Sequence, residues 1–213
     1  MKKQKKDLTP EEEALERYQS LRRLLLFIAI LAVGGLMMTV GPAWENPVAT
    51  AIIRIAAMGT IWVGIVGRMW CTLYIGGHKA DKVVTEGPYS VMRNPLYFFS
   101  TIAAAGVGSM TGTLTAGILF AVLCFFAFQI VIRREERFLS AAFNAPYAEY
   151  CASVPRFFPN PFLFKDPGQV LIDTDRLYRT LIDGLVFFLA LPVFGLAEYL
   201  QKSGMLPVLF SWY

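Results

Sequence analysis

Four side chains that can hydrogen-bond to a ligand lie within one short segment, Gly87–Tyr97: Tyr89, Arg93, Asn94 and Tyr97. The segment begins with a Gly-Pro pair, which predicts a turn because glycine tolerates strained backbone and proline fixes its own φ angle. Its Asn-Pro pair predicts a second turn and a helix start, since proline is favoured in the first turn of a helix. The segment could hold a ligand at a membrane surface, or its arginine could contact lipid headgroups. The residue types alone leave both interpretations open.

A second cluster, Arg133–Arg137, places two carboxylates among three arginines where a long apolar run ends. Glu135 and Glu136 could pair with an ammonium group or with the hydroxyl groups of a ligand. The five residues could instead form a solvated helix end in which the arginines balance the carboxylates. Charge alone does not decide between these interpretations.

Other common chemistries find little support in the sequence. Cys71, Cys124 and Cys151 have no CxxC spacing, so they predict neither a zinc site nor a disulfide framework, and we expect no metal site. The single histidine, His78, lies in a polar loop, where we expect it to be solvated. The net charge of +4 predicts no nucleic acid partner, because basic residues beside membrane spans fix orientation and bind anionic headgroups.

Apolar segments must position the two polar clusters. Of the 213 residues, 55% are hydrophobic, and the mean hydropathy of +0.48 is well above that of a soluble domain. A helix needs roughly 20 residues to cross a bilayer, so we predict an all-α, polytopic membrane helix bundle with about five transmembrane helices. Their expected ranges are Leu24–Val40, Val48–Gly67 (continuing as helix to Tyr74), Leu96–Met110, Leu114–Ile132 and Leu177–Leu196.

Loop charges predict the orientation of this bundle. Nearly all Lys and Arg residues fall in the N-terminal segment, in the loop 76–94 and in the region 133–176. The positive-inside rule therefore places the N-terminus and both polar clusters in the cytoplasm. Thr111-Gly112-Thr113 predicts the tight turn of a helical hairpin, which brings the two clusters together. Arg54 interrupts the second span, and we expect it to snorkel toward the outer face rather than to point inward.

The segment Asp81–Tyr97, Asp-Lys-Val-Val-Thr-Glu-Gly-Pro-Tyr-Ser-Val-Met-Arg-Asn-Pro-Leu-Tyr, resembles the cofactor motif of isoprenylcysteine carboxyl methyltransferases and phospholipid N-methyltransferases. These are integral membrane enzymes that use S-adenosylmethionine. Their second motif is an acidic pair followed by a Phe, a Tyr-x-x-Tyr and an Arg-x-x-Pro element. The similar residues here are Glu135-Glu136, Phe143, Tyr147–Tyr150 and Arg156–Pro159. The resemblance covers roughly residues 74–160.

The resemblance implies a domain organisation for the whole chain. Residues 1–23 would form a cytoplasmic segment, with a short amphipathic helix that starts near Thr9. Residues 24–200 would form the membrane methyltransferase domain, in which residues 74–160 are the cofactor region. Residues 201–213 would form a C-terminal stub.

The resemblance also implies roles for individual residues. Glu135 would pair with the ammonium group or the ribose hydroxyls of the cofactor, and Glu136 would be a helper or substrate-side acid. Tyr89 would cover the adenosyl group, and Arg93 would hold either the loop or the cofactor carboxylate. The expected cofactor-binding residues are Lys82, Val83, Val84, Tyr89, Arg93, Asn94, Pro95, Leu96, Tyr97, Glu135 and Arg156.

Two positions depart from the family pattern. Asn94 stands where many relatives have histidine, so it can donate and accept hydrogen bonds but cannot titrate. The carboxyl methyltransferases have a substrate-carboxylate arginine where this chain has Val131. Arg133 or Arg134 would have to replace it as a catalytic residue beside Glu136, which disfavours prenylcysteine as the substrate.

We therefore expect an integral membrane methyltransferase that uses S-adenosylmethionine and acts on a lipophilic or amphiphilic acceptor, by carboxylate O-methylation or lipid amine N-methylation. Its expected partners are the lipid bilayer and a lipophilic or lipidated substrate, and its expected location is the bacterial inner membrane, with a cytoplasmic site. The alternative is a membrane NADPH-dependent reductase of the sterol reductase type, which residues 93–97 and 147–155 also resemble. The acidic pair and the small size favour the methyltransferase. A non-enzymatic scaffold would have no obvious use for clustered polar loops.

Overall fold

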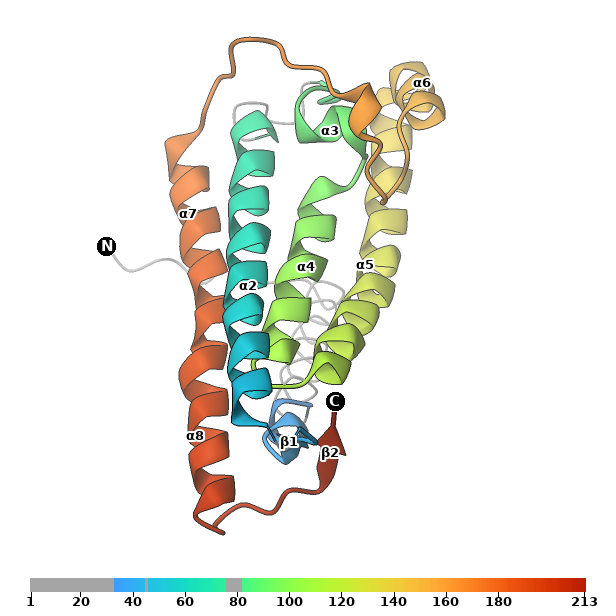
Figure 1. Ribbon diagram of the computed structural model, residues 1–213. Coiled ribbons are helices and arrows are strands. Elements are labelled where there is room, and N and C mark those ends of the chain that lie inside the picture. Colours follow the sequence, from blue (N-terminus) through green and yellow to red (C-terminus); the bar gives the residue numbers. More distant parts are fainter. Residues whose placement is uncertain (1–32, 45, 76–81) are drawn as a thin grey trace, which may run out of the picture.

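The computed structural model describes residues 33–44, 46–75 and 82–213, which fold as an elongated bundle of helices (Figure 1). The elements in chain order are β1 (Val40–Pro42), α2 (Pro47–Ile75), α3 (Pro88–Val91), α4 (Pro95–Ser109), α5 (Leu114–Phe143), α6 (Ala145–Ser153), η1 (Pro161–Leu163), α7 (Thr174–Leu185), η2 (Val186–Leu189), α8 (Ala190–Lys202) and β2 (Phe210–Trp212). Helices α3 and α6 lie at one end of the bundle, and strands β1 and β2 lie at the other (Figure 1). The fold is nearly all-α, as predicted.

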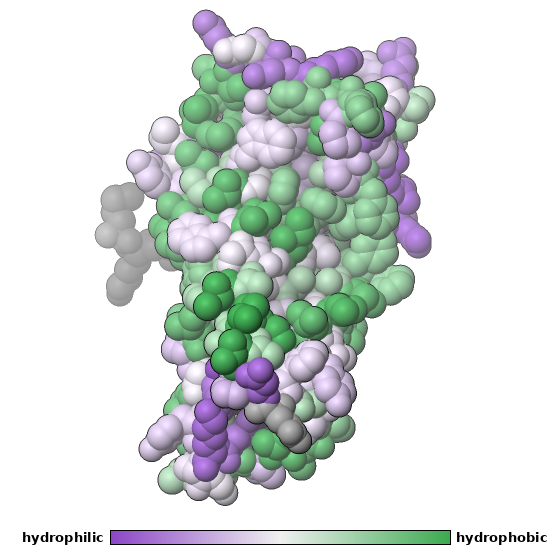
Figure 2. All heavy atoms as spheres, viewed as in Figure 1, coloured by the Kyte–Doolittle hydropathy of each residue, from purple (hydrophilic) through white to green (hydrophobic). Residues whose placement is uncertain are grey.

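Three helical segments among the described residues are long and apolar enough to cross a membrane: α2, α5 and the continuous run Thr174–Lys202. They match the predicted second, fourth and fifth spans. Residues 24–32 of the first predicted span, Leu24–Val40, lie outside the described residues, as does the amphipathic helix expected in residues 1–23. Residues 33–37 are helical as predicted, but Val40 belongs to strand β1 and not to the span. A count of five is therefore not confirmed. A broad hydrophobic band covers the middle of the molecule, and hydrophilic residues gather toward its two ends (Figure 2).

Helix α4 is shorter than a membrane span. It contains 15 residues, which at 1.5 Å per residue gives a length of about 22 Å. The hydrocarbon core of a bilayer is about 30 Å thick. The predicted third span is therefore a real helix that does not cross the membrane by its own length.

Small residues allow α4 to pack closely between α2 and α5, as the sequence predicted. A Cβ added at Gly64 of α2 would lie 2.6 Å from the Cβ of Ala103, and one added at Gly106 of α4 would lie 2.8 Å from the Ala57 carbonyl oxygen. A Cβ added at Gly108 would lie 2.5 Å from the carbonyl oxygen of Ala116 in α5. Such close approach maximises van der Waals contact where lipid tails compete with apolar side chains.

The hairpin between α4 and α5 turns through Thr111-Gly112-Thr113, as predicted. Gly112 has a φ of +88°, a conformation that favours glycine. The Thr113 side chain caps α5 by accepting a hydrogen bond from the Ala116 amide at 3.3 Å. The two threonine hydroxyl groups lie 3.0 Å apart within hydrogen-bond distance.

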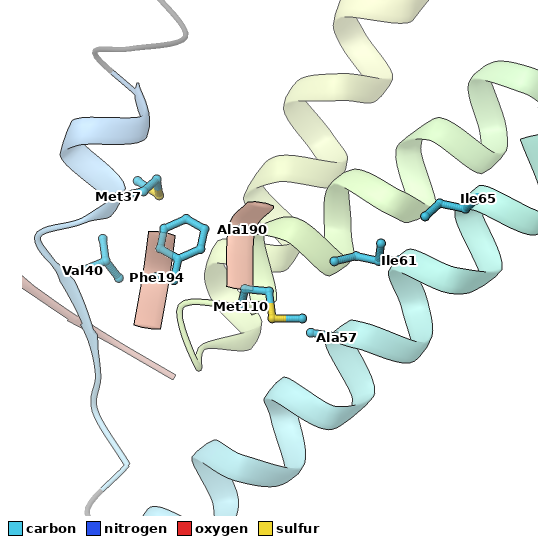
Figure 3. Close-up of a cluster of buried hydrophobic side chains, with 8 residues drawn as sticks. All are labelled: Met37, Val40, Ala57, Ile61, Ile65, Met110, Ala190 and Phe194. Atoms are coloured by element: carbon cyan, nitrogen blue, oxygen red, sulfur yellow. The ribbon is translucent and has the colours of Figure 1, made fainter. Parts of the chain in front are cut away.

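A buried apolar cluster joins the bundle to residues before α2 at the hairpin end. It comprises Met37, Val40, Ala57, Ile61, Ile65, Met110, Ala190 and Phe194, drawn in Figure 3. Strand β1 pairs in parallel with β2, with Val40 opposite Phe210. The sequence analysis did not predict these strands, because three residues are too few to show an alternating pattern.

Polar side chains inside the bundle contact other helices. Arg68 donates a hydrogen bond from Nη1 to Ser100 Oγ at 2.6 Å, and the hydroxyl groups of Thr72 and Thr180 lie 3.0 Å apart. Arg54 pairs with Glu198 of α8 and donates from Nε to the Met110 carbonyl at 3.2 Å. The expectation that Arg54 snorkels toward the outer face stays a prediction, and the sequence analysis did not anticipate its partner Glu198 on a distant segment.

Candidate functional site

A cavity of about 580 Å³ lies at the α3–α6 end of the bundle, within the size range of small-molecule sites. We call it the tyrosine cavity. Its walls come from the segment before α3, the start of α4, the end of α5, and α6. The lining residues are Ile75, Lys82, Val83, Val84, Tyr89, Arg93, Asn94, Pro95, Leu96, Tyr97, Glu135, Glu136, Leu139, Phe143, Tyr147, Tyr150 and Arg176.

Backbone and side-chain hydrogen bonds fix the α3–α4 loop against the segment that follows α6. The Arg93 amide donates to the Pro155 carbonyl at 2.8 Å, and Asn94 Nδ2 donates to the Arg156 carbonyl at 3.0 Å. Asn94 immediately precedes α4, and Pro95 occupies its first turn, as the Asn-Pro pair predicted. These bonds join two loops that lie about 60 residues apart in the chain and hold the two motifs together.

Gly87 sets the entrance to α3. Its φ is +58°, and a Cβ added there would lie 2.3 Å from the ring of Tyr74, so any other residue would be strained and crowded. The Gly87 amide donates to the Lys165 carbonyl at 2.7 Å. Ser90 Oγ accepts from the Lys165 amide at 2.9 Å and donates to the Gly87 carbonyl at 2.6 Å. The predicted Gly-Pro turn is thus held by hydrogen bonds to Lys165, which lies far along the chain.

The two adjacent glutamates have different surroundings. Glu136 is only 8% exposed and is paired with two guanidinium groups. Its carboxylate accepts hydrogen bonds from the Arg156 guanidinium, with Nε of Arg156 3.1 Å from Oε1 of Glu136. The same Oε1 lies 3.4 Å from Nη1 of Arg93. Glu135 is exposed and accepts a hydrogen bond from the Tyr97 hydroxyl at 2.6 Å. Neighbours on a helix lie about 100° apart, which explains how one carboxylate is enclosed while the other faces the open cavity.

The carboxylate of Glu135 forms no ion pair with any residue in the described part of the chain. It lies among aromatic rings and the apolar side chains of Val83 and Val84. Lys82, Arg93 and Arg176 also line the cavity. A site with an unpaired carboxylate, tyrosine rings and basic side chains suits a ligand that carries both positive and negative charge, through ion pairing and cation–π contact. The donor set therefore fits a sulfonium cofactor that also carries an ammonium group and hydroxyl groups.

The phenol groups around the cavity are neutral hydrogen-bond donors. Burial raises the pKa of Tyr89, Tyr147 and Tyr150 above the ordinary value of a phenol. The Tyr150 hydroxyl donates to the Tyr89 carbonyl at 2.7 Å, which ties α6 to α3. At physiological pH these groups order the cavity wall and do not supply a base.

Most of the predicted site residues line this cavity: Lys82, Val83, Val84, Tyr89, Arg93, Asn94, Pro95, Leu96, Tyr97, Glu135 and Glu136. Arg156 does not line the cavity but pairs with Glu136, which does. Arg133 and Arg134 are exposed and do not line it either. His78 lies outside the described residues.

The prediction of site residues missed several side chains that the structure brings to the cavity. Leu139 lies one helical turn after Glu135, so helical spacing could have identified it. Tyr147 and Tyr150 belong to the quoted motif but were not assigned to the cofactor site. Arg176 comes from α7, and no local pattern indicates that it reaches the cavity.

Comparison with known proteins places the chain among membrane methyltransferases and their relatives. The profile of the phospholipid methyltransferase family matches residues 47–145. The nickel-cobalt-cadmium resistance protein NccN of Alcaligenes xylosoxydans xylosoxydans is 29% identical over 200 residues, which cover 93% of this chain and 92% of that protein. The cobalt-zinc-cadmium resistance protein CzcN of Cupriavidus metallidurans is 35% identical over 150 residues, which cover 70% and 68%.

A shorter match connects the chain to enzymes of known reaction type. The protein-S-isoprenylcysteine O-methyltransferase B of Arabidopsis thaliana is 37% identical over 78 residues, which cover 37% of this chain and 40% of that protein. No solved structure gives a significant match. The chain therefore belongs to the family of membrane methyltransferases that includes the phospholipid methyltransferases and the isoprenylcysteine carboxyl methyltransferases.

Proposed function

We propose that the protein transfers a methyl group from S-adenosylmethionine to an amphiphilic acceptor at the tyrosine cavity. The observation that carries the proposal is the unpaired carboxylate of Glu135, which accepts a hydrogen bond from Tyr97 inside a tyrosine-lined cavity of suitable size. The membership in a methyltransferase family supports a positively charged methyl donor as the ligand of that carboxylate.

Under this proposal, the cofactor is held by residues from both motifs. Glu135 pairs with its ammonium group or ribose hydroxyls, and Tyr89 covers the adenosyl group. The backbone of Lys82–Val84 borders the adenine. Glu136 fixes Arg93 and Arg156, so these three residues keep the two loops in place. Asn94 positions the start of α4 through its bond to the Arg156 carbonyl.

When bound, the cofactor supplies an activated methyl group on a positively charged sulfur. The chain contributes proximity, orientation and exclusion of water, because the leaving group needs no further activation. A carboxylate acceptor needs no base, whereas an amine must first lose its proton. Arg133 and Arg134, exposed at the same end of α5, are proposed to contact the acceptor's headgroup at the membrane surface.

Two of the relatives are named for resistance to nickel, cobalt, zinc and cadmium. We propose that any part this chain has in such resistance depends on methylation of a membrane acceptor. We further propose that the tyrosine cavity faces the cytoplasm, where the methyl donor is made, since the basic loops lie at that end.

Calorimetry on the detergent-purified protein tests the cofactor. We expect heat of binding with S-adenosylmethionine and S-adenosylhomocysteine, and none with NADPH. Glu135→Gln should weaken binding roughly ten- to a hundredfold, because a hydrogen bond to a charged group is worth about 1.5–3 kcal/mol. Glu149→Gln, an exposed change on α6 away from the cavity, is the matched control. Heat with NADPH and none with the sulfonium pair would end the methyltransferase proposal.

Reporter fusions test the orientation independently of the cofactor. A reporter inserted after Met110 in the full chain, so that α5 is kept, should report the outside, and one fused after Ala142 should report the cytoplasm. The opposite pattern would separate the proposed site from its supply of methyl donor.

A further inference from the structure

A second cavity, of about 670 Å³, lies at the opposite end of the bundle from the tyrosine cavity, between α2 and α8. We call it the Arg54 cavity. Its lining residues are Pro42, Trp44, Pro47, Thr50, Ala51, Arg54, Ile55, Met58, Met110, Leu191, Gly195, Glu198 and Lys202. None of these residues belongs to the sequence motifs or lines the tyrosine cavity.

Among the described residues, the charged groups that line this cavity sum to a net positive charge. Glu198 pairs with both Arg54 and Lys202, the latter at 2.7 Å. Two cations and one carboxylate sum to +1. The Lys202 side chain is 76% exposed, so its remaining N–H groups are accessible, since an ammonium group has three donors. The cluster therefore favours an anionic ligand.

An indole N–H at the same cavity is a second observation that favours a ligand with hydrogen-bond acceptors. Trp44 lines the cavity, and its Nε1 is buried without a hydrogen-bond partner in the described part of the chain. A buried donor without a partner costs free energy, which a ligand oxygen would recover. Edge-to-face packing on Tyr213, with ring centroids 5.2 Å apart, holds the indole in place.

The polar and the apolar residues that line the Arg54 cavity lie at different positions along the bundle axis. Helices α2 and α8 run in opposite directions along the bundle (Figure 1). The charged residues Arg54 and Lys202 lie toward the bundle end, whereas Met58 and Leu191 lie further along the helices toward its middle. A ligand that fits this gradient has a charged head at the bundle end and an apolar chain directed into the membrane.

No residue in the described part of the chain covers the wall of the cavity at Gly195. Gly195 lines the cavity, and a Cβ added there would meet no heavy atom within 4 Å. A larger side chain at this position would occupy cavity space without displacing its neighbours. Gly59 of α2 is equally open but lines neither cavity, so it provides a matched control.

We propose that the Arg54 cavity binds an amphiphile with an anionic headgroup, a membrane phospholipid in the leaflet at the hairpin end. The phosphate would accept hydrogen bonds from Lys202, Arg54 and the Trp44 indole, and one acyl chain would lie along Ile55, Met58 and Leu191. This site is independent of the methyl transfer proposed above.

Native mass spectrometry of the full chain in mild detergent tests this proposal, with phosphatidylglycerol and phosphatidylcholine of identical acyl chains as probes. We expect phosphatidylglycerol to bind at least fivefold tighter, because one basic residue near a charged headgroup is worth about that factor. Gly195→Leu should reduce retention of phosphatidylglycerol at least fivefold, and Gly59→Leu should leave it within twofold. Lys202→Gln should remove most of the preference for the anionic lipid.

Three outcomes would overturn the proposal. They are equal binding of the two lipids, unchanged retention in Gly195→Leu, or displacement of the lipid by millimolar inorganic phosphate, which would assign the cluster to a free anion. Binding of S-adenosylmethionine by Gly195→Leu and Lys202→Gln serves as the folding control. If the parent binds no S-adenosylmethionine, the proposed function fails while the lipid comparison still stands, with thermal stability as its folding control.

Discussion

The two cavities are similar in volume, about 580 and 670 Å³, but they differ in whether a carboxylate in the lining is left without an ion-pair partner among the described residues. In the tyrosine cavity, Arg93 is paired with Glu136 and Arg176 with Asp173, whereas Glu135 and Lys82 form no ion pair with any described residue. In the Arg54 cavity, the only carboxylate among the described lining residues, Glu198, is paired with two basic side chains, and a positive charge remains among them. A carboxylate without an ion-pair partner among the described residues, which only the tyrosine cavity has, therefore distinguishes the ligands that the two cavities suit.

The two cavities also differ in construction. The tyrosine cavity is held by hydrogen bonds between loops, such as those from Arg93 and Asn94 to the segment after α6. The Arg54 cavity lies mainly between two long helices. A single substitution can therefore loosen the first cavity, whereas the second should tolerate changes at its exposed rim.

The largest effect should follow from Glu136→Gln, because it removes the partner of both Arg93 and Arg156. Breaking a buried ion pair by removing one partner costs about 3 kcal/mol or more, and the enclosed Arg93 guanidinium would be left uncompensated. We expect a fall of several degrees in the thermal midpoint in detergent, together with weaker cofactor binding. Lipid binding at the Arg54 cavity should persist.

A double variant that also replaces Arg156, one of the two partners of Glu136, provides the control for that experiment. Glu136→Gln combined with Arg156→Gln should recover part of the lost stability, because the double variant leaves fewer unpaired charges. A single variant as stable as the parent protein would show that Glu136 does not hold the two loops.

Charge reversal in each cavity tests the comparison directly. Glu135→Lys should lower affinity for S-adenosylmethionine by more than a hundredfold and leave lipid preference unchanged. Lys202→Glu should abolish the preference for phosphatidylglycerol and leave cofactor affinity within twofold. Calorimetry and native mass spectrometry on the same preparations measure both properties. A reversal that changes both ligands equally would mean that the cavities are not independent.

A smaller effect is expected from Tyr97→Phe, which keeps the ring but removes the hydroxyl that donates to Glu135 at 2.6 Å. A net hydrogen bond contributes about 0.5–1.5 kcal/mol, which corresponds to roughly a two- to tenfold loss of cofactor affinity. Tyr178→Phe, an exposed change on α7, is the matched control. Unchanged cofactor affinity in Tyr97→Phe would mean that Glu135 needs no help from that hydroxyl to hold its orientation.

The smallest effect should be the salt dependence of the two ligands. Between low and moderate ionic strength, the preference for anionic lipid should fall severalfold, because Lys202 is largely exposed and exposed charges are screened. Cofactor affinity should change less, since Glu135 acts at short range within a cavity. Parallel titrations at two salt concentrations measure the difference, and an equal decline for both ligands would contradict it.

The sequence predicted those features that depend on local pattern. The apolar runs predicted α2 and α5 closely, and Thr111-Gly112-Thr113 predicted the turn between α4 and α5. Most residues of the first motif line the tyrosine cavity. The helices and the turn follow from composition and spacing within one segment, whereas the roles of the motif residues were expected from the resemblance to a methyltransferase family.

Features that depend on which faces of distant helices meet could not be predicted. Glu198 lies 144 residues after Arg54, so no local pattern showed that Arg54 has an internal partner. The enclosure of Glu136 by Arg156 likewise depends on the rotation of α5 relative to the segment after α6. Arg176 reaches the tyrosine cavity only because α7 packs beside α2.

The short length of α4 has a consequence for how the protein enters a membrane. With 15 residues, the helix is too short to be retained alone as a stable spanning segment during synthesis. Its glycine-lined contacts with α5 and the three-residue turn between them make the hairpin the smallest unit that can insert. Defects in the first turns of α5 should therefore impair membrane insertion of α4 as well as of α5, in addition to any loss of stability in the folded protein.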